Sequence, residues 1–240
     1  MPVLELESGE FLQRFGVPGE TVELGLFEEA QGCAIAISEE PFDSKHLGLR
    51  IGRMRIARIG DPAQLGRVLM EVGSVARKRG YVQLLSRQEA GNLPLTWALE
   101  EAGFRLMDVG VTFERPVPSS SPPGSISLRP CSREELKSSM EEFVHLEWNS
   151  RYDRDPFYDR ARIDDLRRQW LWNSHDGRAD RFLTAAVEGR TAGFITCLLR
   201  PDHAEIDLIG TLPGFRQKGV GRSLVEGALH AYGGRSPRMT

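Results

Sequence analysis

The stretch Ile206-Asp207-Leu208-Ile209-Gly210-Thr211-Leu212-Pro213-Gly214-Phe215-Arg216-Gln217-Lys218-Gly219-Val220-Gly221-Arg222-Ser223-Leu224-Val225 decides how this chain is interpreted. It predicts a strand, a tight loop and a helix. Apolar and polar residues alternate over 206–208 as in a strand, Pro213-Gly214 breaks the pattern, and apolar residues then recur at helical spacing. Gly219 and Gly221 lie where this helix begins.

The start of this helix predicts an anion-binding site. Glycines there let the backbone approach a ligand, and the N–H groups of the first helical turn face that ligand at the positive end of the helix dipole. Arg216, Lys218 and Arg222 add positive charge, which favours a pyrophosphate over a single carboxylate. The spacing fits neither a P-loop nor the Gly-x-Gly-x-x-Gly of dinucleotide-binding folds. The alternative is a structural turn that binds nothing.

The composition is typical of a soluble globular protein. The chain has 240 residues, 40% of them hydrophobic, and its formal net charge of −3 disfavours nucleic acid as a partner. Cys33, Cys131 and Cys197 are too widely spaced for a disulfide framework or a metal site. We therefore expect a cytoplasmic protein without a metal cofactor. The sequence contains no apolar run of membrane-spanning length and no secretory signal, so neither a membrane span nor secretion is expected.

A Pro- and Ser-rich stretch over residues 116–125 divides the chain. Such a stretch is typical of an interdomain linker, so we predict two domains, 1–115 and 126–240. The first domain is expected to contain a helix from Pro62 to Gly80, a strand over 81–86, a short helix over 92–102 and a strand pair ending at Glu114. The second is expected to contain a strand over 126–130, a helix from Ser132 to Trp148 opened by a capping box with Glu135, a helix over 164–172, and a hairpin of strands 182–187 and 193–199.

The run Arg216-Gln217-Lys218-Gly219-Val220-Gly221 resembles the acyl-CoA pyrophosphate loop of the GNAT N-acetyltransferases. The elements around it follow the order of the first two thirds of a GNAT domain, and residues 1–115 resemble a degenerate half of such a domain without its phosphate loop; any small α+β module is the alternative for them. The resemblance implies an α/β fold with mixed sheets, a tandem of GNAT-like halves, and acetyl-CoA as co-substrate. It implies coenzyme contacts for Ile209, Gly210, Leu212, Arg216, Gln217, Lys218, Gly219, Val220, Gly221, Arg222 and Ser223.

Two further segments resemble the TDP-fucosamine acetyltransferase-like sugar N-acyltransferases. They are 41–48, Pro-Phe-Asp-Ser-Lys-His-Leu-Gly, and 150–158, Ser-Arg-Tyr-Asp-Arg-Asp-Pro-Phe-Tyr. The first departs from the family pattern, since Phe42 replaces Trp and His46 and Leu47 replace aromatic residues. The resemblance implies acetyl transfer to the amine of a nucleotide-linked amino sugar, a small-molecule partner. It implies substrate contacts for Arg151, Tyr152, Phe157, Tyr158 and Trp170, whereas a surface loop with anchoring rings is the alternative.

Attack of an amine on a thioester needs a base, a polarised carbonyl and an acid for the leaving thiolate. Glu205 and Asp207 alternate on the strand beside the loop and are candidate catalytic bases; a solvated strand face is the alternative. The backbone N–H of Ile209 or Leu212 is the candidate to hold the carbonyl oxygen.

The resemblance also implies a strand and a helix after the loop helix, which commonly contribute a Tyr that protonates the leaving thiolate. This sequence ends at Thr240, where that strand would begin. Tyr232 is not expected to replace that Tyr, because it lies at the end of the loop helix. An open sheet edge would favour a homodimer. Three functions stay open: acetylation of a nucleotide-linked amino sugar, acetylation of a peptide, polyamine or amino-acid amine, and a non-catalytic acyl-CoA-binding remnant.

Overall fold

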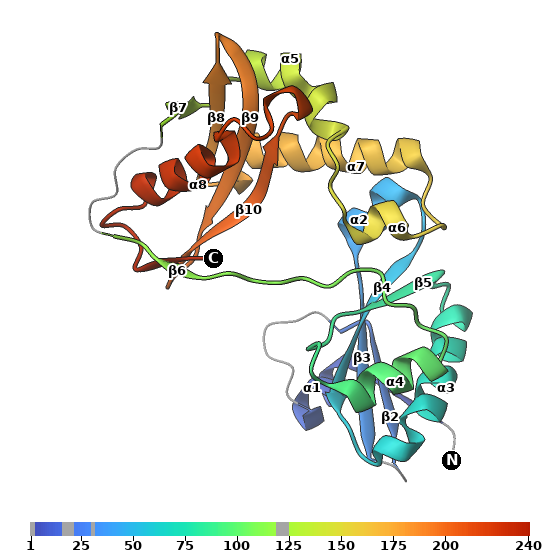
Figure 1. Cartoon of the computed structure of the whole chain (residues 1–240). Helices are drawn as coiled ribbons and strands as arrows, with labels where there is room; N and C mark the ends of the chain where they lie inside the picture. The colour runs from blue at the N-terminus through green and yellow to red at the C-terminus, as the bar shows by residue number, and fades with distance from the viewer. Residues whose placement is uncertain (1–2, 16–21, 30–31, 119–124) are drawn as a thin grey trace. The chain divides into compact units, whose positions relative to one another are not determined.

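The computed structural model describes residues 3–15, 22–29, 32–118 and 125–240, which divide into two compact units (Figure 1). The first unit contains Met1–Val109 and Ser150–Arg162, and the second contains Gly110–Asn149 and Ile163–Thr240. Each unit has its own sheet and its own hydrophobic core. Residues 119–124 of the expected linker lie outside the described residues.

The first unit is built on a five-stranded sheet in the order β1-β2-β3-β4-β5. Strands β1 to β4 pair antiparallel, whereas β4 and β5 pair parallel. The parallel pair requires a crossover, which helix α3 supplies. The strands are β1 (Leu4–Leu6), β2 (Leu24–Glu28), β3 (Cys33–Glu39), β4 (Ile51–Arg58) and β5 (Gln83–Ser86).

Helices cover both faces of this sheet. The apolar sides of α3 (Leu65–Lys78) and α4 (Leu93–Glu101) form one core with β2, β3 and β4, and α1 (Ser8–Phe15) packs on the other face through Phe11. The helix expected from Pro62 begins with a 3₁₀ turn, and Gly80 follows its end with φ of 85°. The remaining helices of the unit are η1 (Pro62–Gln64), α2 (Pro41–Leu47) and α6 (Arg151–Arg154).

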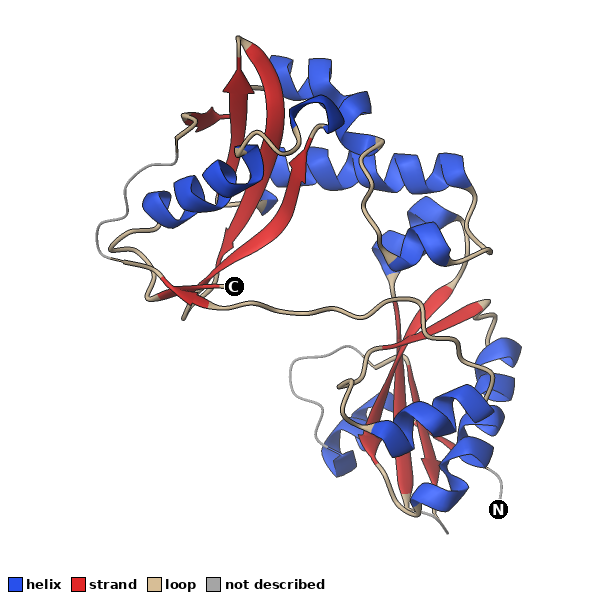
Figure 2. Cartoon of the chain, viewed as in Figure 1, coloured by secondary structure: helices blue, strands red, loops and turns tan. Residues whose placement is uncertain are grey.

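The second unit is built on a six-stranded sheet in the order β6-β11-β10-β9-β8-β7. Strands β7 to β10 form an antiparallel meander, and β11 pairs parallel with β10 and antiparallel with β6. Helix α8 packs against β8, β9 and β10 (Figure 2). The elements are β6 (Arg115–Pro116), β7 (Leu128–Pro130), β8 (Arg181–Val187), β9 (Arg190–Leu199), β10 (Ala204–Thr211), η3 (Pro213–Phe215), α8 (Val220–Ala231) and β11 (Arg238–Met239).

Two more helices cover this sheet, and both begin near the predicted residues. Ser132 caps α5 (Arg133–Val144) by accepting the Glu135 N–H at 3.1 Å, and α7 (Arg160–Asn173) is followed by a π-helical turn, η2 (Ser174–Arg178). Helix α5 ends before the predicted Trp148. The predicted capping box forms only in part, because the Glu135 carboxylate accepts from Thr191 and Arg129 rather than from the Ser132 N–H. None of the helices formed by the described residues is long and apolar enough to span a membrane.

Three expectations about the chain between these elements were wrong. The predicted strand pair ending at Glu114 does not form in the described residues. The strand between α4 and residue 118 is β6, and β6 belongs to the sheet of the second unit. Val117, placed in the linker, is buried in the core of that unit. Residues 150–162, predicted within the second domain, pack with the first unit.

The edge of β10 that was expected to be open carries β11 over part of its length. The Ile206 N–H donates to the Thr240 carbonyl at 2.7 Å, and the Thr240 N–H donates to the Ala204 carbonyl at 2.9 Å. Because β11 is short, it covers only the beginning of β10.

Candidate functional site

The loop between β10 and α8 contains two residues with positive φ. Gln217 has φ of 61°, and Gly219, the N-cap of α8, has φ of 80°, which glycine adopts without strain. A Cβ at Gly219 would meet nothing within 4 Å, and one at Gly221 would meet only Thr211 Oγ1, at 3.5 Å. The backbone conformation therefore favours glycine at 219. The packing around Gly221 leaves room for a side chain, so the first turn of α8 is open to a ligand.

The cations expected around this loop lie on the surface. Arg216 pairs with Glu147 at 2.8 Å, Arg222 pairs with Glu226 at 2.7 Å, and the Lys218 ammonium lies 5.5 Å from the centre of the Phe215 ring. Exposed pairs of this kind contribute little to stability. A polyanion at the start of α8 can therefore compete for these side chains at small cost.

The outer edge of β10 forms the second part of the site. Leu212 donates its backbone N–H to the Ala192 carbonyl of β9 at 2.9 Å, and bonded and non-bonded positions alternate along an antiparallel pair. Ile209 therefore directs its N–H away from β9, toward the outer edge. The register of β11 with β10 is confined to Ala204, so among the described residues no strand covers Ile209 on that side.

Three of the predicted coenzyme contacts have structural roles in the fold. Leu212 is wrong as a donor to a carbonyl oxygen, because its N–H already donates to Ala192. The Ser223 hydroxyl is buried, lies 3.2 Å from Ser125 Oγ and accepts the Ile126 N–H at 3.3 Å, so its side chain faces β7 rather than a ligand. Gly210 lets Phe194 and Leu146 pack against the strand, since a Cβ would collide with both.

The two candidate bases on β10 both form ion pairs. Glu205 accepts from Arg200 Nε at 2.8 Å, and Asp207 binds Arg178 through both carboxylate oxygens, at 2.5 and 2.9 Å. The hydrogen bond to Asp207 is the main cause that raises the pKa of Arg178. A role as base for either carboxylate stays a prediction, and it requires a proton to be taken up beside an arginine.

Comparison with known proteins identifies this part of the chain. Residues 140–236 match the acetyltransferase (GNAT) family. They form a GNAT acetyltransferase domain. The spore coat polysaccharide biosynthesis protein SpsD of Bacillus subtilis (strain 168) is 23% identical over 201 residues, which are 82% of this chain and 69% of SpsD.

Solved structures share the fold of this chain over almost its whole length. A GCN5-related N-acetyltransferase from Sphaerobacter thermophilus aligns with a TM-score of 0.55 and 14% identity, over 97% of this chain and 75% of its own. A conserved protein of unknown function from Staphylococcus epidermidis ATCC 12228 aligns with a TM-score of 0.50 and 14% identity, over 95% and 84%. The mixed α/β fold with two sheets in tandem is therefore confirmed.

The segments that resemble sugar N-acyltransferases meet within the first unit. Asp43 on α2 is buried and accepts hydrogen bonds from Arg151 at 2.6 Å and from the Tyr152 hydroxyl at 2.9 Å. The Tyr158 hydroxyl donates to Gln83 on β5. Burial raises the pKa of the Tyr152 hydroxyl, and the charge of Asp43 adds to this increase. These groups anchor residues 150–158 to the unit, and their contact with a substrate stays a prediction.

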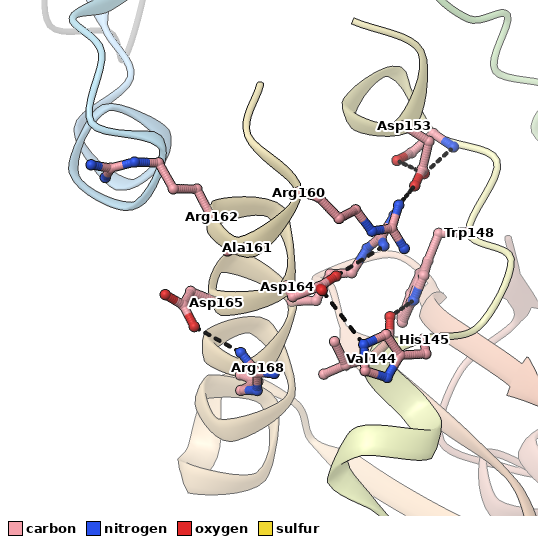
Figure 3. Close-up of polar contacts among 12 residues, drawn as sticks. Val144, His145, Trp148, Asp153, Arg160, Ala161, Arg162, Asp164, Asp165 and Arg168 are labelled. Atoms are coloured by element: carbon pink, nitrogen blue, oxygen red, sulfur yellow. Dashed lines mark hydrogen bonds and ion pairs between the residues drawn. The ribbon is translucent and has the colours of Figure 1, made fainter. Parts of the chain in front are cut away.

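The other two predicted substrate contacts are Phe157 in the first unit and Trp170 in the second. Phe157 is 78% exposed, whereas Trp170 on α7 is half-buried in the GNAT domain, with its ring centre 6.4 Å from that of Trp148. Figure 3 shows Trp148 directing its indole N–H toward the Val144 carbonyl, 3.1 Å away, and His145 directed toward Asp164 on α7. Trp170 therefore packs against Trp148, which follows the end of α5.

Neither Tyr232 nor a cysteine offers the GNAT domain an accessible acid or nucleophile. The Tyr232 hydroxyl is buried and donates to Asp180 at 2.7 Å, and burial raises its pKa. Burial also raises the pKa of the Cys131 and Cys197 thiols to about 12. Among the residues the structure describes, no group of three or more His, Cys, Asp or Glu side chains is placed to hold a metal ion.

We expect all three cysteines to resist thiol reagents in the folded protein because they are buried, and the raised pKa of Cys131 and Cys197 adds to this resistance. At about pH 8, a thiol with a pKa near 12 is ionised in roughly one molecule in ten thousand, and only the thiolate reacts. A spectrophotometric thiol assay should detect no rapid reaction in native buffer and full reaction in guanidinium chloride. Rapid labelling of Cys131 or Cys197 in the native protein would contradict their burial.

Proposed function

We propose that this chain transfers an acetyl group from acetyl-CoA to the amine of a nucleotide-linked amino sugar, in the cytoplasm. The observation that carries the proposal is the arrangement at the end of β10. There the Gly219 cap leaves the first turn of α8 open to an anion, and the Ile209 N–H points to the outer edge of β10, which no strand covers at this position among the described residues. Acyl-CoA chemistry needs both an anion site and a donor for a carbonyl oxygen.

The residues of this chain fit acetyl-CoA as follows. The N–H groups of Val220, Gly221 and Arg222 would hold the pyrophosphate at the start of α8, with charge from Arg216 and Lys218. The Ile209 N–H would hold the thioester oxygen. Acetyl-CoA supplies an activated acetyl group, which the amine nitrogen takes as the carbon–sulfur bond breaks. Glu205 or Asp207 would accept the proton that the amine loses.

A sugar acceptor is supported by the relative in polysaccharide biosynthesis and by the two segments that resemble sugar N-acyltransferases. Arg151 is held by Asp43 inside the first unit, so this arginine is not the main support for an anionic acceptor. The cytoplasm is supported by the cysteines, since all three lie in the described residues and none of them forms a disulfide. A homodimer stays a prediction that sedimentation can test, because β11 leaves most of the β10 edge uncovered among the described residues.

Two measurements in sequence test the proposal. Calorimetric titration of the 240-residue protein with acetyl-CoA is expected to give a micromolar Kd. Release of free CoA is then followed with nucleotide-linked amino sugars, the matching free amino sugars, a polyamine and a peptide amine. Turnover with the nucleotide-linked sugars is the expected result. Turnover confined to the polyamine or peptide would replace the acceptor, and binding without turnover of any amine would favour a non-catalytic acyl-CoA-binding protein.

A further inference from the structure

Strand β10 contains an extra residue at Asp207. Ile206 lies opposite Cys197 of β9 and Leu208 lies opposite Thr196, so Asp207 has no partner of its own in the ladder. This is a β-bulge, in which two residues of one strand oppose one residue of the other.

The bulge reverses which backbone groups of β10 face its outer edge. Before it, the Ile206 N–H points outward, to Thr240; after it, the Leu212 N–H points inward, to Ala192. These residues are an even number apart, so in a regular strand both N–H groups would point the same way. Without the bulge, the Ile209 N–H would face β9. The Ile209 N–H is therefore available as the donor of the proposed site because the bulge adds Asp207 to strand β10.

Two side chains hold this bulge. Thr196 is fully buried, and its Oγ1 accepts the Leu208 N–H at 3.0 Å, which satisfies a donor that the bulge removes from the regular ladder. Arg178 binds both oxygens of Asp207, whose side chain is only 14% exposed. Arg178 is itself placed by the η2 turn, where it donates to the buried Ser174 hydroxyl at 3.4 Å.

We propose that Thr196 and Arg178 are positioning residues for acetyl transfer, and that Asp207 belongs to this clamp instead of serving as the base. This inference rests on the proposed function, because it names what fixes the Ile209 N–H at the outer edge. A bidentate arginine pair restrains both carboxylate oxygens in one plane, a geometry that suits fixing a backbone more than exchanging protons.

Thr196→Val tests the hydroxyl, with Thr196→Ser as the conservative rescue. Hydrogen exchange at the Leu208 amide is expected to accelerate at least about tenfold in Thr196→Val, whereas the Leu212 amide, bonded to a carbonyl, keeps its rate. The kcat should fall about tenfold or more while the Kd for acetyl-CoA changes less than about twofold, since the loop at Gly219 is untouched. Thr196→Ser should restore both. Unchanged exchange at Leu208 would overturn the clamp whatever the activity.

Asp207→Asn and Arg178→Gln separate a clamp from a base. If Asp207 and Arg178 act only through their ion pair, each substitution should lower kcat to a similar extent. The double variant should then have a kcat no lower than that of either single variant. If Asp207 is the base, Asp207→Asn should abolish turnover and Arg178→Gln should not, which would overturn the proposal. Arg168→Gln is the matched control, because it breaks ion pairs with Glu141 and Asp165 away from β10 and should leave kcat within about twofold of the wild type. The two proposals can fail separately. If exchange at Leu208 accelerates in Thr196→Val but the wild type acetylates no amine, the proposed function is wrong and the role of Thr196 in holding the bulge is supported.

Discussion

Gly219→Asp is expected to weaken acetyl-CoA binding at least about a hundredfold. The new carboxylate would sit at the N-cap of α8, where it accepts the same first-turn N–H groups that the pyrophosphate needs, and it would repel the phosphates. The positive φ at this position adds strain. Calorimetric titration with acetyl-CoA measures the loss, and circular dichroism confirms that the variant is folded.

Gly189→Asp provides the matched control for this substitution. Gly189 lies in the turn between β8 and β9 with φ of 76°, and a Cβ there would meet nothing within 4 Å, so both the strain and the added charge equal those at Gly219. Its affinity for acetyl-CoA should stay within about twofold of the wild type. An equal loss in both variants would mean that strain, and not the anion site, explains the effect.

Elements specified by neighbouring residues were predicted well from the sequence. Ser132 and Glu135 mark the start of α5, and the turn residues before β9 mark the hairpin, because caps and turns depend on side chains a few positions apart. The loop at Gly219 was predicted for the same reason. The structure places Gly219 at the N-cap of α8, where the sequence predicted the helix to begin, whereas the positive φ of this residue is a finding of the structure.

Features that depend on distant partners were missed. Apolar and polar residues alternate in the segment before Arg115 as in a strand, but a strand also needs the edge of another strand to pair with. In this part of the described chain only β6 pairs with another strand, β11. Ser223 is a polar residue in a loop that binds anions, yet its hydroxyl bonds to the chain near Ser125, 98 positions away. The bulge at Asp207 leaves no mark in the periodicity, because it is defined by the register with β9.

Asp43→Ala is expected to destabilise the first unit by about 3 kcal/mol. Asp43 is the shared acceptor for Arg151 and Tyr152, and removing it would leave the guanidinium of Arg151, whose side chain is 22% exposed, without its carboxylate partner. The loss should be largest where residues 150–162 pack with this unit. Hydrogen exchange across that segment, with denaturant unfolding of the whole chain, measures the effect.

Lys45→Ala is the control on the same helix, since Lys45 is exposed while Asp43 is buried. Its unfolding free energy should change by less than about 0.5 kcal/mol. Faster exchange over 150–162 in Asp43→Ala alone would place the anchor at this carboxylate. It would also explain how a segment resembling a substrate loop comes to be held by Asp43, which is 108 positions from Arg151 in the sequence. If Asp43→Ala leaves exchange in that segment unchanged, the aromatic contacts between Tyr152 and Tyr158 suffice to hold it, and Arg151 is available for a phosphate of the acceptor after all.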